Sequence, residues 1–446
     1  MERFFKLKEL GTNVRTEIMA GITTFMTMAY ILAVNPAILS GAGLGEYSVF
    51  LATALAAGIF TIAMGLIVNF PVALAPGMGL NAYFLTVVLS SNGEITPQMA
   101  LTAVFISGLI FIVLTITKIR QLLVVAVPDA LKHAITVGIG LFITIIGLKN
   151  SGVMAINVLD DGSTLITMGH LSDPSVWLTL LGLAIIAILM VLKVKGAILI
   201  GILITALIGA IPGVGVTDFS TLRTGQWVPD FAQLNFWHFD FTGLLTVGIL
   251  TAIATFTFVE LFDTFGTLVG TANRAGLLKD KEEGQKRIGK AMLVDAVSVS
   301  GGAMLGTSTV TAYIESSSGI AEGGRSGLTA VTTGVLFLLA LFLAPIALLI
   351  PSPATSAALI VVGVLMVQMI REIDFSDLVI AVPAFLTIVM MPLTYNIANG
   401  ISFGIVSYVL LALVGNLVSG KKHKIHWLLW VLFVLVILRY AFLGGE

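Results

Sequence analysis

Residues 70–81 of this chain read Phe70-Pro71-Val72-Ala73-Leu74-Ala75-Pro76-Gly77-Met78-Gly79-Leu80-Asn81. Two prolines and two glycines in so short a stretch are incompatible with a regular helix. A second stretch, in the other half of the chain, reads Gly306-Thr307-Ser308-Thr309-Val310-Thr311-Ala312-Tyr313-Ile314-Glu315-Ser316-Ser317-Ser318-Gly319 and is polar and rich in β-branched residues. Each stretch is predicted to form a short extended segment that leads into a half-helix.

The sequence around both stretches is strongly apolar. Of the 446 residues, 57% are hydrophobic and only 11% are charged, and the mean hydropathy is +1.06, whereas soluble domains carry about 25% charged residues. We therefore predict one large, all-α polytopic membrane domain. Broken backbone at membrane depth must be buried in protein or line a cavity, because lipid cannot satisfy its N–H and C=O groups. Matching breaks in two halves of a chain are typical of a transporter's binding site.

Apolar runs of about 20 residues, the length of a membrane span, recur along the whole chain. No cleavable signal peptide is evident, so the first run is expected to be retained as a span. The predicted spans are 16–38, 48–70, 71–90, 98–117, 128–149, 176–193, 197–212, 242–271, 288–306, 307–323, 326–350, 354–370, 376–393 and 397–419. Fourteen spans divide into repeats of seven, and repeats with an odd number of spans have opposite orientations in the membrane.

Basic residues give the orientation, because Lys and Arg concentrate in cytoplasmic loops. With residues 1–15 in the cytoplasm, almost all of the 23 lysines and arginines fall on the cytoplasmic side, and only Lys149 and Arg223 fall outside. Arg439 stays unassigned. Residues 213–241 are then an external linker, and 420–446 comprise a basic loop and a last apolar helix. That helix, 425–443, either spans or lies at the interface; its tryptophans, Arg439 and Tyr440 favour the interface.

Acidic residues deep in spans are the main functional candidates, since a charged residue at the bilayer centre costs about 2.5–3.5 kcal/mol on insertion scales. Glu260 and Asp263 are three residues apart and share one helix face, and Glu315 begins the second half-helix. Asn81, at the start of the first half-helix, is either a binding residue or a plain N-cap. Buried acids without basic partners also exchange protons, so Glu260, Asp263 and Glu315 are the candidates for proton coupling.

Carboxylates, an amide and two helix N-termini place hydrogen-bond donors and acceptors close together. Such a site suits a flat heteroaromatic base better than a sugar or an inorganic anion, which the carboxylates repel. Gly79 and Thr311, from the two breaks, are expected to belong to the site. Phe25 and Phe256 are candidates to stack on a base, with core packing as the alternative for each.

Other function classes find little support in the sequence. The chain has no cysteine, a formal net charge of -1 and five histidines without metal-ligand spacing, so we expect no metal, no cofactor and no nucleic-acid partner. Residues 284–291 resemble a phosphate loop but end in Ala291, which lacks the magnesium-binding hydroxyl. Nucleophile-elbow and zinc-protease motifs are missing, so an enzyme is not expected.

Three segments resemble the AzgA-like branch of the nucleobase-cation symporter family, and the resemblance extends from about Phe4 to Leu443. They are Ala75-Pro76-Gly77-Met78-Gly79-Leu80-Asn81-Ala82-Tyr83-Phe84, Val259-Glu260-Leu261-Phe262-Asp263-Thr264-Phe265-Gly266-Thr267-Leu268 and Gly306-Thr307-Ser308-Thr309-Val310-Thr311-Ala312-Tyr313-Ile314-Glu315-Ser316. The opening, 17–36, is similar to bacterial guanine/hypoxanthine permeases. Ser316 follows Glu315 where the uracil and xanthine branch has asparagine, which makes uracil and xanthine less expected substrates.

The resemblance implies two inverted repeats, 16–212 and 242–419. Spans 1–4 and 8–11 would form a core domain that slides against a gate domain of spans 5–7 and 12–14. It also implies that Glu260 and Glu315 hold the base, together with Asn81, and that Asp263 takes part in binding or proton coupling. The implied function is import of guanine or hypoxanthine, and possibly of adenine, by proton symport through the plasma membrane. Family members often form homodimers. An anion transporter of the same fold, a sodium-coupled symporter and a membrane enzyme are the alternatives.

Overall fold

The computed structural model describes residues 2–91, 93–117, 126–158, 164–211, 214–278, 281–418 and 423–442. Within these residues, ten helices are long and apolar enough to cross a bilayer. They are Val14–Ser40, Glu46–Val68, Pro97–Ile116, Asp129–Asn150, Pro174–Val191, Gly248–Arg274, Glu282–Leu305, Gly327–Ala347, Ser352–Glu372 and Ile397–Val418. Shorter apolar helices cover Met78–Ser90, Ala197–Gly209, Leu378–Leu393 and Trp427–Ala441. The prediction of a helical, polytopic membrane protein is confirmed.

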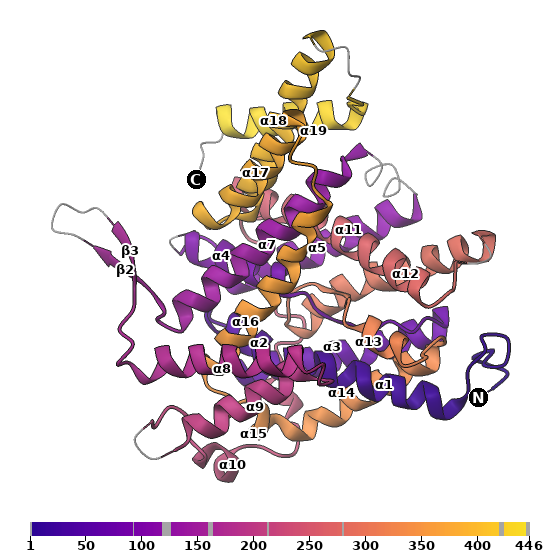
Figure 1. Cartoon of the computed structure of the whole chain (residues 1–446), viewed down its shortest axis with the longest axis vertical. Helices are drawn as coiled ribbons and strands as arrows, with labels where there is room; N and C mark the ends of the chain where they lie inside the picture. The colour runs from indigo at the N-terminus through magenta and orange to yellow at the C-terminus, as the bar shows by residue number, and fades with distance from the viewer. Residues whose placement is uncertain are drawn as a thin grey trace.

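The first half of the chain begins with α1 and ends with a hairpin and the two helices after it (Figure 1). They are α1 (Val14–Met28), α2 (Ile31–Ser40), α3 (Glu46–Ala63), the π-turn η1 (Met64–Val68), β1 (Leu74–Pro76), α4 (Met78–Ser90), α5 (Pro97–Ile116), α7 (Asp129–Asn150), β2 (Met154–Val158), β3 (Thr164–Met168), α8 (Pro174–Val191) and α9 (Ala197–Gly209). The predicted first span is thus two helices, α1 and α2, that meet near Tyr30.

The second half starts after a linker that contains two short helical turns. Its elements are α10 (Ser220–Thr224), η2 (Phe231–Gln233), α11 (Val247–Arg274), α12 (Lys281–Leu305), β4 (Val310–Ala312), α13 (Ser316–Ala321), α14 (Gly327–Leu339), η3 (Ala340–Leu343), α15 (Ala344–Ala347), α16 (Ser352–Val367), η4 (Gln368–Glu372), α17 (Leu378–Leu393), α18 (Ile397–Val418) and α19 (Trp427–Phe442). The predicted tenth span, 307–323, is therefore a strand followed by a six-residue helix.

The two interrupted stretches meet in the interior as an antiparallel pair of strands. Ala75 of β1 lies opposite Thr311 of β4. Both extended segments lie where the sequence predicted them; their pairing with each other was not predicted. Backbone groups just outside the strand pair also have partners. The Ser316 hydroxyl accepts the Ala73 N–H at 3.0 Å, and the Ala73 carbonyl accepts the Tyr313 N–H at 3.0 Å. Non-helical backbone is thus tolerated at this depth because protein surrounds it.

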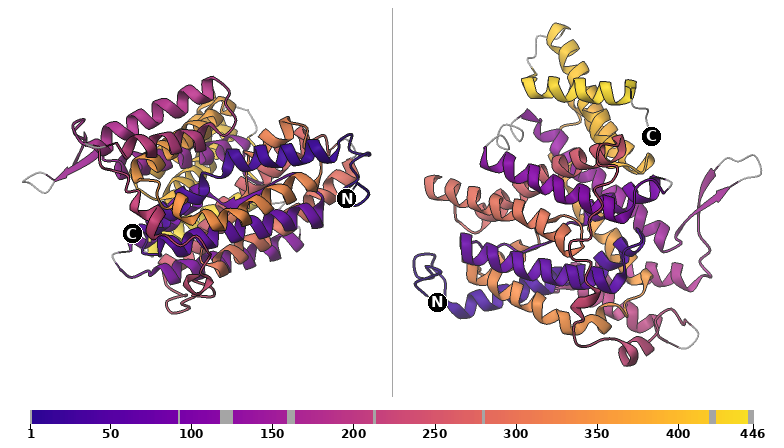
Figure 2. Two further views of the ribbon diagram at one scale, coloured as in Figure 1. Left: turned by 90° about the horizontal axis from the view of Figure 1, so that it is seen from below. Right: turned by 180° about the vertical axis from the view of Figure 1, so that it is seen from behind.

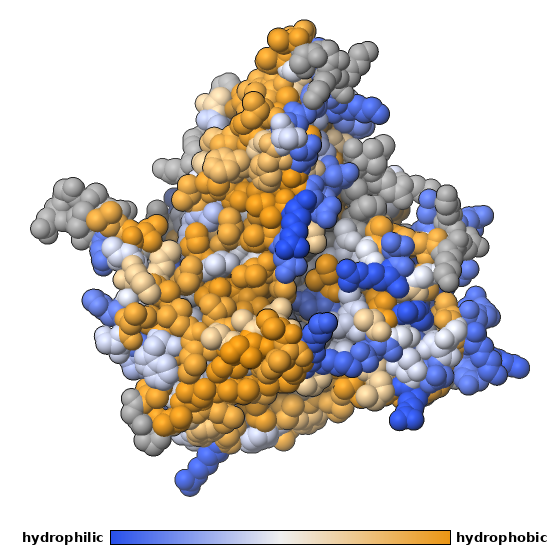
Figure 3. Space-filling view, in the orientation of Figure 1, coloured by the Kyte–Doolittle hydropathy of each residue, from blue (hydrophilic) through white to orange (hydrophobic). Residues whose placement is uncertain are grey.

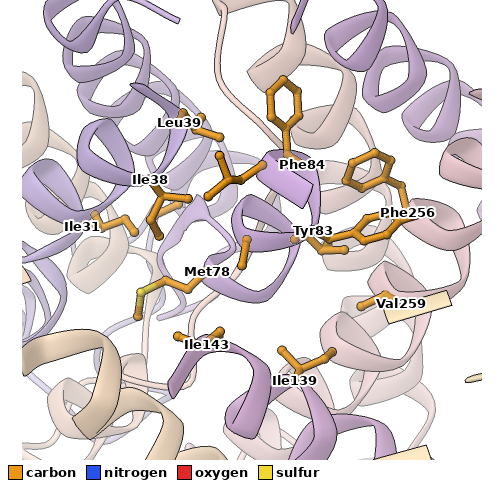
Figure 4. Packing of buried hydrophobic residues seen from close by; sticks show 14 of the residues in the cluster. Ile31, Ile38, Leu39, Met78, Tyr83, Phe84, Ile139, Ile143, Phe256 and Val259 are labelled. Carbon is orange, nitrogen blue, oxygen red and sulfur yellow. The ribbon is translucent and has the colours of Figure 1, made fainter. Parts of the chain in front are cut away.

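The helices pack in two groups around this strand pair. One group contains α1, α3, α5, α11, α12 and α14; the other contains α7, α8, α9, α16, α17 and α18. The half-helix α4 lies between them and packs on α2, α7 and α11. Figure 4 shows this central packing, in which Met78 and Phe84 of α4 lie among Ile38, Ile143 and Phe256. The strand pair is therefore held mainly by the first group but adjoins the second.

A buried carboxylate fastens the first helix of the chain to the second half. Glu17 in α1 is fully buried, and its oxygens accept the backbone N–H groups of Arg325 at 2.8 Å, Ser326 at 3.2 Å and Thr329 at 3.2 Å. The Thr329 hydroxyl donates to the same side chain at 2.6 Å. Glu17 thus supplies acceptors to backbone N–H groups where α14 begins.

Two peripheral elements complete the molecule. Strands β2 and β3 form a hairpin that projects from the helices, a feature that the sequence did not predict (Figure 1; Figure 2, right). The last helix, α19, has 16 residues, fewer than the about 20 of an upright span, and whether it spans or lies at the interface stays a prediction. Figure 3 shows a broad apolar face over α8, α9 and α16, whereas hydrophilic residues gather toward the end that carries the N-terminus and α12.

Candidate functional site

A cavity of about 160 Å³ lies where the half-helix α4 leaves the strand pair. Both helix groups line it, and so do both interrupted stretches. Its lining residues are Tyr30, Gly77, Met78, Gly79, Thr136, Thr267, Thr311, Ala312, Tyr313, Ile314, Glu315, Val362, Leu365, Met366 and Met369. An engineered cavity of about 150 Å³ in another protein admits benzene, so this space is of the size that suits a small flat ring.

Glu315 is the acidic residue on the cavity wall. It is partly buried just before α13, and the Tyr30 hydroxyl donates a hydrogen bond of 2.7 Å to its Oε1. This bond uses one acceptor site of a side chain whose two oxygens have about four. The remaining acceptor capacity can meet N–H groups of a ligand in the cavity.

Glu260 lies behind the wall. It is fully buried in α11, and its Oε1 accepts a hydrogen bond of 2.9 Å from the Thr264 hydroxyl. The Thr264 hydroxyl is in turn 3.0 Å from the hydroxyl of Thr311, which lines the cavity. Two hydroxyl groups therefore connect this carboxylate to the cavity, and Glu260 does not itself line it.

Asn81 is buried behind the wall as well, in an amide and hydroxyl network. Its Nδ2 donates to Asn35 Oδ1 at 2.6 Å, and its Oδ1 accepts from the Ser308 hydroxyl. Asn35 Nδ2 donates to the hydroxyls of Thr53, at 2.7 Å, and Thr307, at 2.8 Å. This network joins the two interrupted stretches, so in this structure Asn81 connects them rather than facing the cavity.

The other predicted site residues have different surroundings. Gly79 lines the cavity, and a Cβ atom there would lie 2.5 Å from Cγ2 of Ile139 in α7, so a side chain at position 79 would require the Ile139 side chain to shift. Phe256 packs edge-on against Tyr83, with ring centroids 5.0 Å apart, and Phe25 packs in the same way against Phe337, with centroids 5.1 Å apart. Neither Phe256 nor Phe25 lines the cavity. The side chain of Asp263 lies outside the described residues.

Sequence reasoning missed two polar residues of this region. Asp295 in α12 is fully buried, and its Oδ1 accepts the Ala312 N–H at 3.2 Å, directly beside Thr311. It lies inside a predicted span, so the rule that singled out the other intramembrane acids applies to it equally. Tyr313 lines the cavity, and its hydroxyl donates to the Pro76 carbonyl of the opposite strand.

Two larger cavities lie elsewhere, but neither has the same chemistry. One, of about 570 Å³, adjoins the site: Glu315 lines it too, together with Lys193, Lys195 and Glu322. The two cavities are therefore neighbours, with Glu315 between them. The other, of about 560 Å³, is mainly apolar, with Arg439 and three hydroxyl residues in its lining, and it shares no lining residue with the site. The 160 Å³ cavity is the candidate site because both interrupted stretches and an acidic side chain converge on it.

Comparisons with known proteins agree with this architecture. The sequence model described as "Permease family" matches residues 15–403. A guanine/hypoxanthine permease of Bacillus subtilis is 45% identical over 99% of this chain and 100% of its own length. An adenine permease of Escherichia coli is 44% identical over 92% of this chain and 89% of its own. Among solved structures, the transmembrane domain of a cyanobacterium bicarbonate transporter has a TM-score of 0.64 at 16% identity, over 87% of this chain and 97% of that one.

Proposed function

Because the chain belongs to the Permease family, we propose that it imports purine nucleobases through the plasma membrane by proton symport. Its relatives are permeases, and the chain is likewise a transporter and not an enzyme. The observation that carries the proposal is the small cavity beside a half-helix, with one acidic side chain on its wall and a second linked to it through hydroxyls. Purine rings are flat and carry N–H groups at their edges, which carboxylates accept.

Uptake of labelled bases tests the proposal directly. Cells that lack their own purine permeases should accumulate labelled hypoxanthine or guanine when they express this chain. The solved structure of similar fold is a bicarbonate transporter, so labelled bicarbonate and sulfate serve as the alternative substrates. Transport of either anion without any purine would replace the proposal, and the Glu315 carboxylate is the feature that argues against it.

The proposed architecture is two inverted seven-span repeats, 16–212 and 242–419, with residues 1–15 in the cytoplasm. The antiparallel pairing of β1 with β4 supports it, since equivalent segments of opposite orientation meet in this way at a pseudo-two-fold axis. The two helix groups correspond to a core domain (spans 1–4 and 8–11) and a gate domain (spans 5–7 and 12–14). Movement of one group against the other would open the site to each side of the membrane in turn.

One ion pair bridges the two groups and gives a test of this movement. Lys195, just before α9, lies 2.7 Å from Glu322, the C-cap of α13, and α13 packs on α1 and α11 of the first group. The chain has no cysteine, so a Lys195→Cys/Glu322→Cys variant can be linked by a short bifunctional thiol reagent without a background reaction. We expect linking to reduce purine uptake at least tenfold, because it fixes the α8–α9 loop to α13.

The matched control is a pair within one helix. Lys286 and Glu282 also lie 2.7 Å apart, but both belong to α12. Linking a Lys286→Cys/Glu282→Cys variant should leave uptake within about twofold of the unlinked protein. Full uptake by the linked Lys195→Cys/Glu322→Cys variant would show that the two helix groups do not separate during transport.

The preferred purine follows from hydrogen-bond matching at Glu315. Guanine presents N1–H and an N2–H side by side, hypoxanthine presents N1–H, and adenine presents an unprotonated N1. A buried polar group left unpaired costs about 1–3 kcal/mol, roughly 5- to 150-fold in affinity. We therefore expect guanine and hypoxanthine to compete with each other for uptake, and adenine to compete at least tenfold less well.

The relatives do not decide between these substrates, since the guanine/hypoxanthine and the adenine permease are almost equally similar to this chain. A protonated glutamic acid donates to adenine N1 and would reverse the preference. Competition against labelled hypoxanthine at fixed pH measures the order, and adenine outcompeting unlabelled hypoxanthine tenfold would show that the ionised carboxylate is not what selects the base.

A further inference from the structure

An apolar groove of about 560 Å³ runs between α11, α18 and α19, separate from the substrate cavity. Its walls are aliphatic and aromatic side chains such as Phe258 of α11, Ile401 of α18 and Leu435 of α19. Its size lies within the about 300–1,000 Å³ range of ligand pockets. A large apolar recess on a membrane protein faces lipid rather than water.

Arg439 is the basic residue in this groove. Its guanidinium lies 5.0 Å from the ring of Tyr440, and the structure gives it no hydrogen bond or ion pair to any described residue. The Tyr440 hydroxyl donates to Asn399 Oδ1 of α18 at 2.6 Å, which fastens this end of α19 beside the groove. A guanidinium carries five N–H donors and cannot lose its charge, so in an apolar setting it needs an acceptor.

We propose that the groove binds one membrane phospholipid, with its phosphate on Arg439 and an acyl chain along the apolar wall. The arginine matches phosphate in charge and in its two-pronged donor geometry. The aliphatic and aromatic wall matches a hydrocarbon chain. Position supports the assignment as well, because Arg439 and Tyr440 are residue types that anchor helices at headgroup level.

The proposed lipid lies between helices of different groups. One wall of the groove is α11, the helix of the first group that holds Glu260. The opposite wall includes α18, which packs with α17 and α7 of the second group. A bound lipid would therefore contact both groups at once. This inference concerns a second binding site and holds whichever substrate the chain transports.

Lipid retention can be measured by native mass spectrometry of the full-length protein after delipidation and titration with phosphatidylglycerol. We expect the unmodified protein to bind one phospholipid more tightly than the rest, and Arg439→Gln to weaken that binding at least tenfold. Arg439→Lys should retain part of it. Diacylglycerol, which has the chains without the phosphate, and inorganic phosphate, which has no chain, should fail to displace the lipid.

A second pair of variants tests the apolar wall without touching the charge. Ala254→Trp places a large ring inside the groove and should expel the lipid, whereas Leu410→Trp adds the same ring at an exposed position of α18 outside it. Arg371→Gln is the charge control, at an exposed arginine distant from the groove in sequence. Melting temperatures of all variants confirm folding.

Equal lipid binding by Arg439→Gln, Ala254→Trp and the unmodified protein would overturn the proposal. So would a dimer that dissociates on Ala254→Trp while the lipid count stays constant, because a second copy of the chain would then occupy the groove. Displacement by inorganic phosphate alone would likewise replace a lipid site with an anion site.

Discussion

Replacing Glu315 with glutamine is expected to reduce purine uptake about 100-fold, and Glu260→Gln should have an effect of similar size. Glutamine places an N–H₂ donor where the carboxylate had only acceptors, so a purine N–H at Glu315 would face a donor. Each buried mismatch costs about 1–3 kcal/mol, and the proposed proton-binding group is lost at the same time. Initial rates of labelled hypoxanthine uptake measure the change.

Both substitutions are expected to leave the protein folded and inserted. Glutamine retains an oxygen that accepts the Tyr30 hydroxyl at position 315 and the Thr264 hydroxyl at position 260, and it removes a buried charge. Glu282→Gln is the control, because Glu282 is an exposed acid of α12 that lines neither of the two cavities at Glu315. Normal uptake by both the 260 and the 315 variants, with normal amounts in the membrane, would remove these acids from the site.

The sequence was most informative where a local rule applies. Pro71 and Pro76 disfavour a regular helix whatever surrounds them, and the observed β1, Leu74–Pro76, agrees with that. Intramembrane acids are costly at any position, so Glu260 and Glu315 could be singled out without a fold. The same rule would have identified Asp295, which the sequence analysis overlooked.

Contacts between distant segments were beyond sequence reasoning. The hydrogen bonds of Asn81 run to Asn35 and Ser308, which are 46 and 227 residues away along the chain. Nothing local indicates whether such an amide faces a cavity or a neighbouring segment. The aromatic candidates show the same limit: Phe256 is a plausible stacking residue by sequence, but its surroundings depend on where α4 packs, and α4 brings Tyr83 against it.

The paired strands explain why the site needs both halves of the chain. β1 sets the start of α4 and β4 precedes Glu315, and their hydrogen bonds fix one relative to the other. Asp295 and Thr264 attach β4 to α12 and α11. In the proposed mechanism, a proton or a base that binds at Glu315 would act on a unit that includes four separate segments, and this would couple the two.

Proton coupling predicts that a protonophore will lower purine accumulation at least tenfold, to the level of passive equilibration, and that replacing sodium with choline will change uptake by less than twofold. Transfer of a carboxylate out of water favours its neutral, protonated form, so a half-buried acid such as Glu315 can take up a proton and release it as the site opens to each side. Lysine and arginine are missing from the described lining of the 160 Å³ cavity, and Lys193 and Lys195 line the adjoining one, so the proposal assigns a proton to Glu315 on the side of the smaller cavity.

The Glu315→Gln and Glu260→Gln variants separate coupling from binding. A variant that loses only the proton site should still exchange labelled for unlabelled base across the membrane while it no longer accumulates base against a gradient, whereas a variant that loses binding should do neither. We expect Glu315→Gln to lose both, because Glu315 lines the cavity, and Glu260→Gln to retain more exchange, because Glu260 reaches the cavity only through Thr264 and Thr311. Strict dependence of uptake on sodium, with no response to the protonophore, would show instead that a bound cation balances these carboxylates.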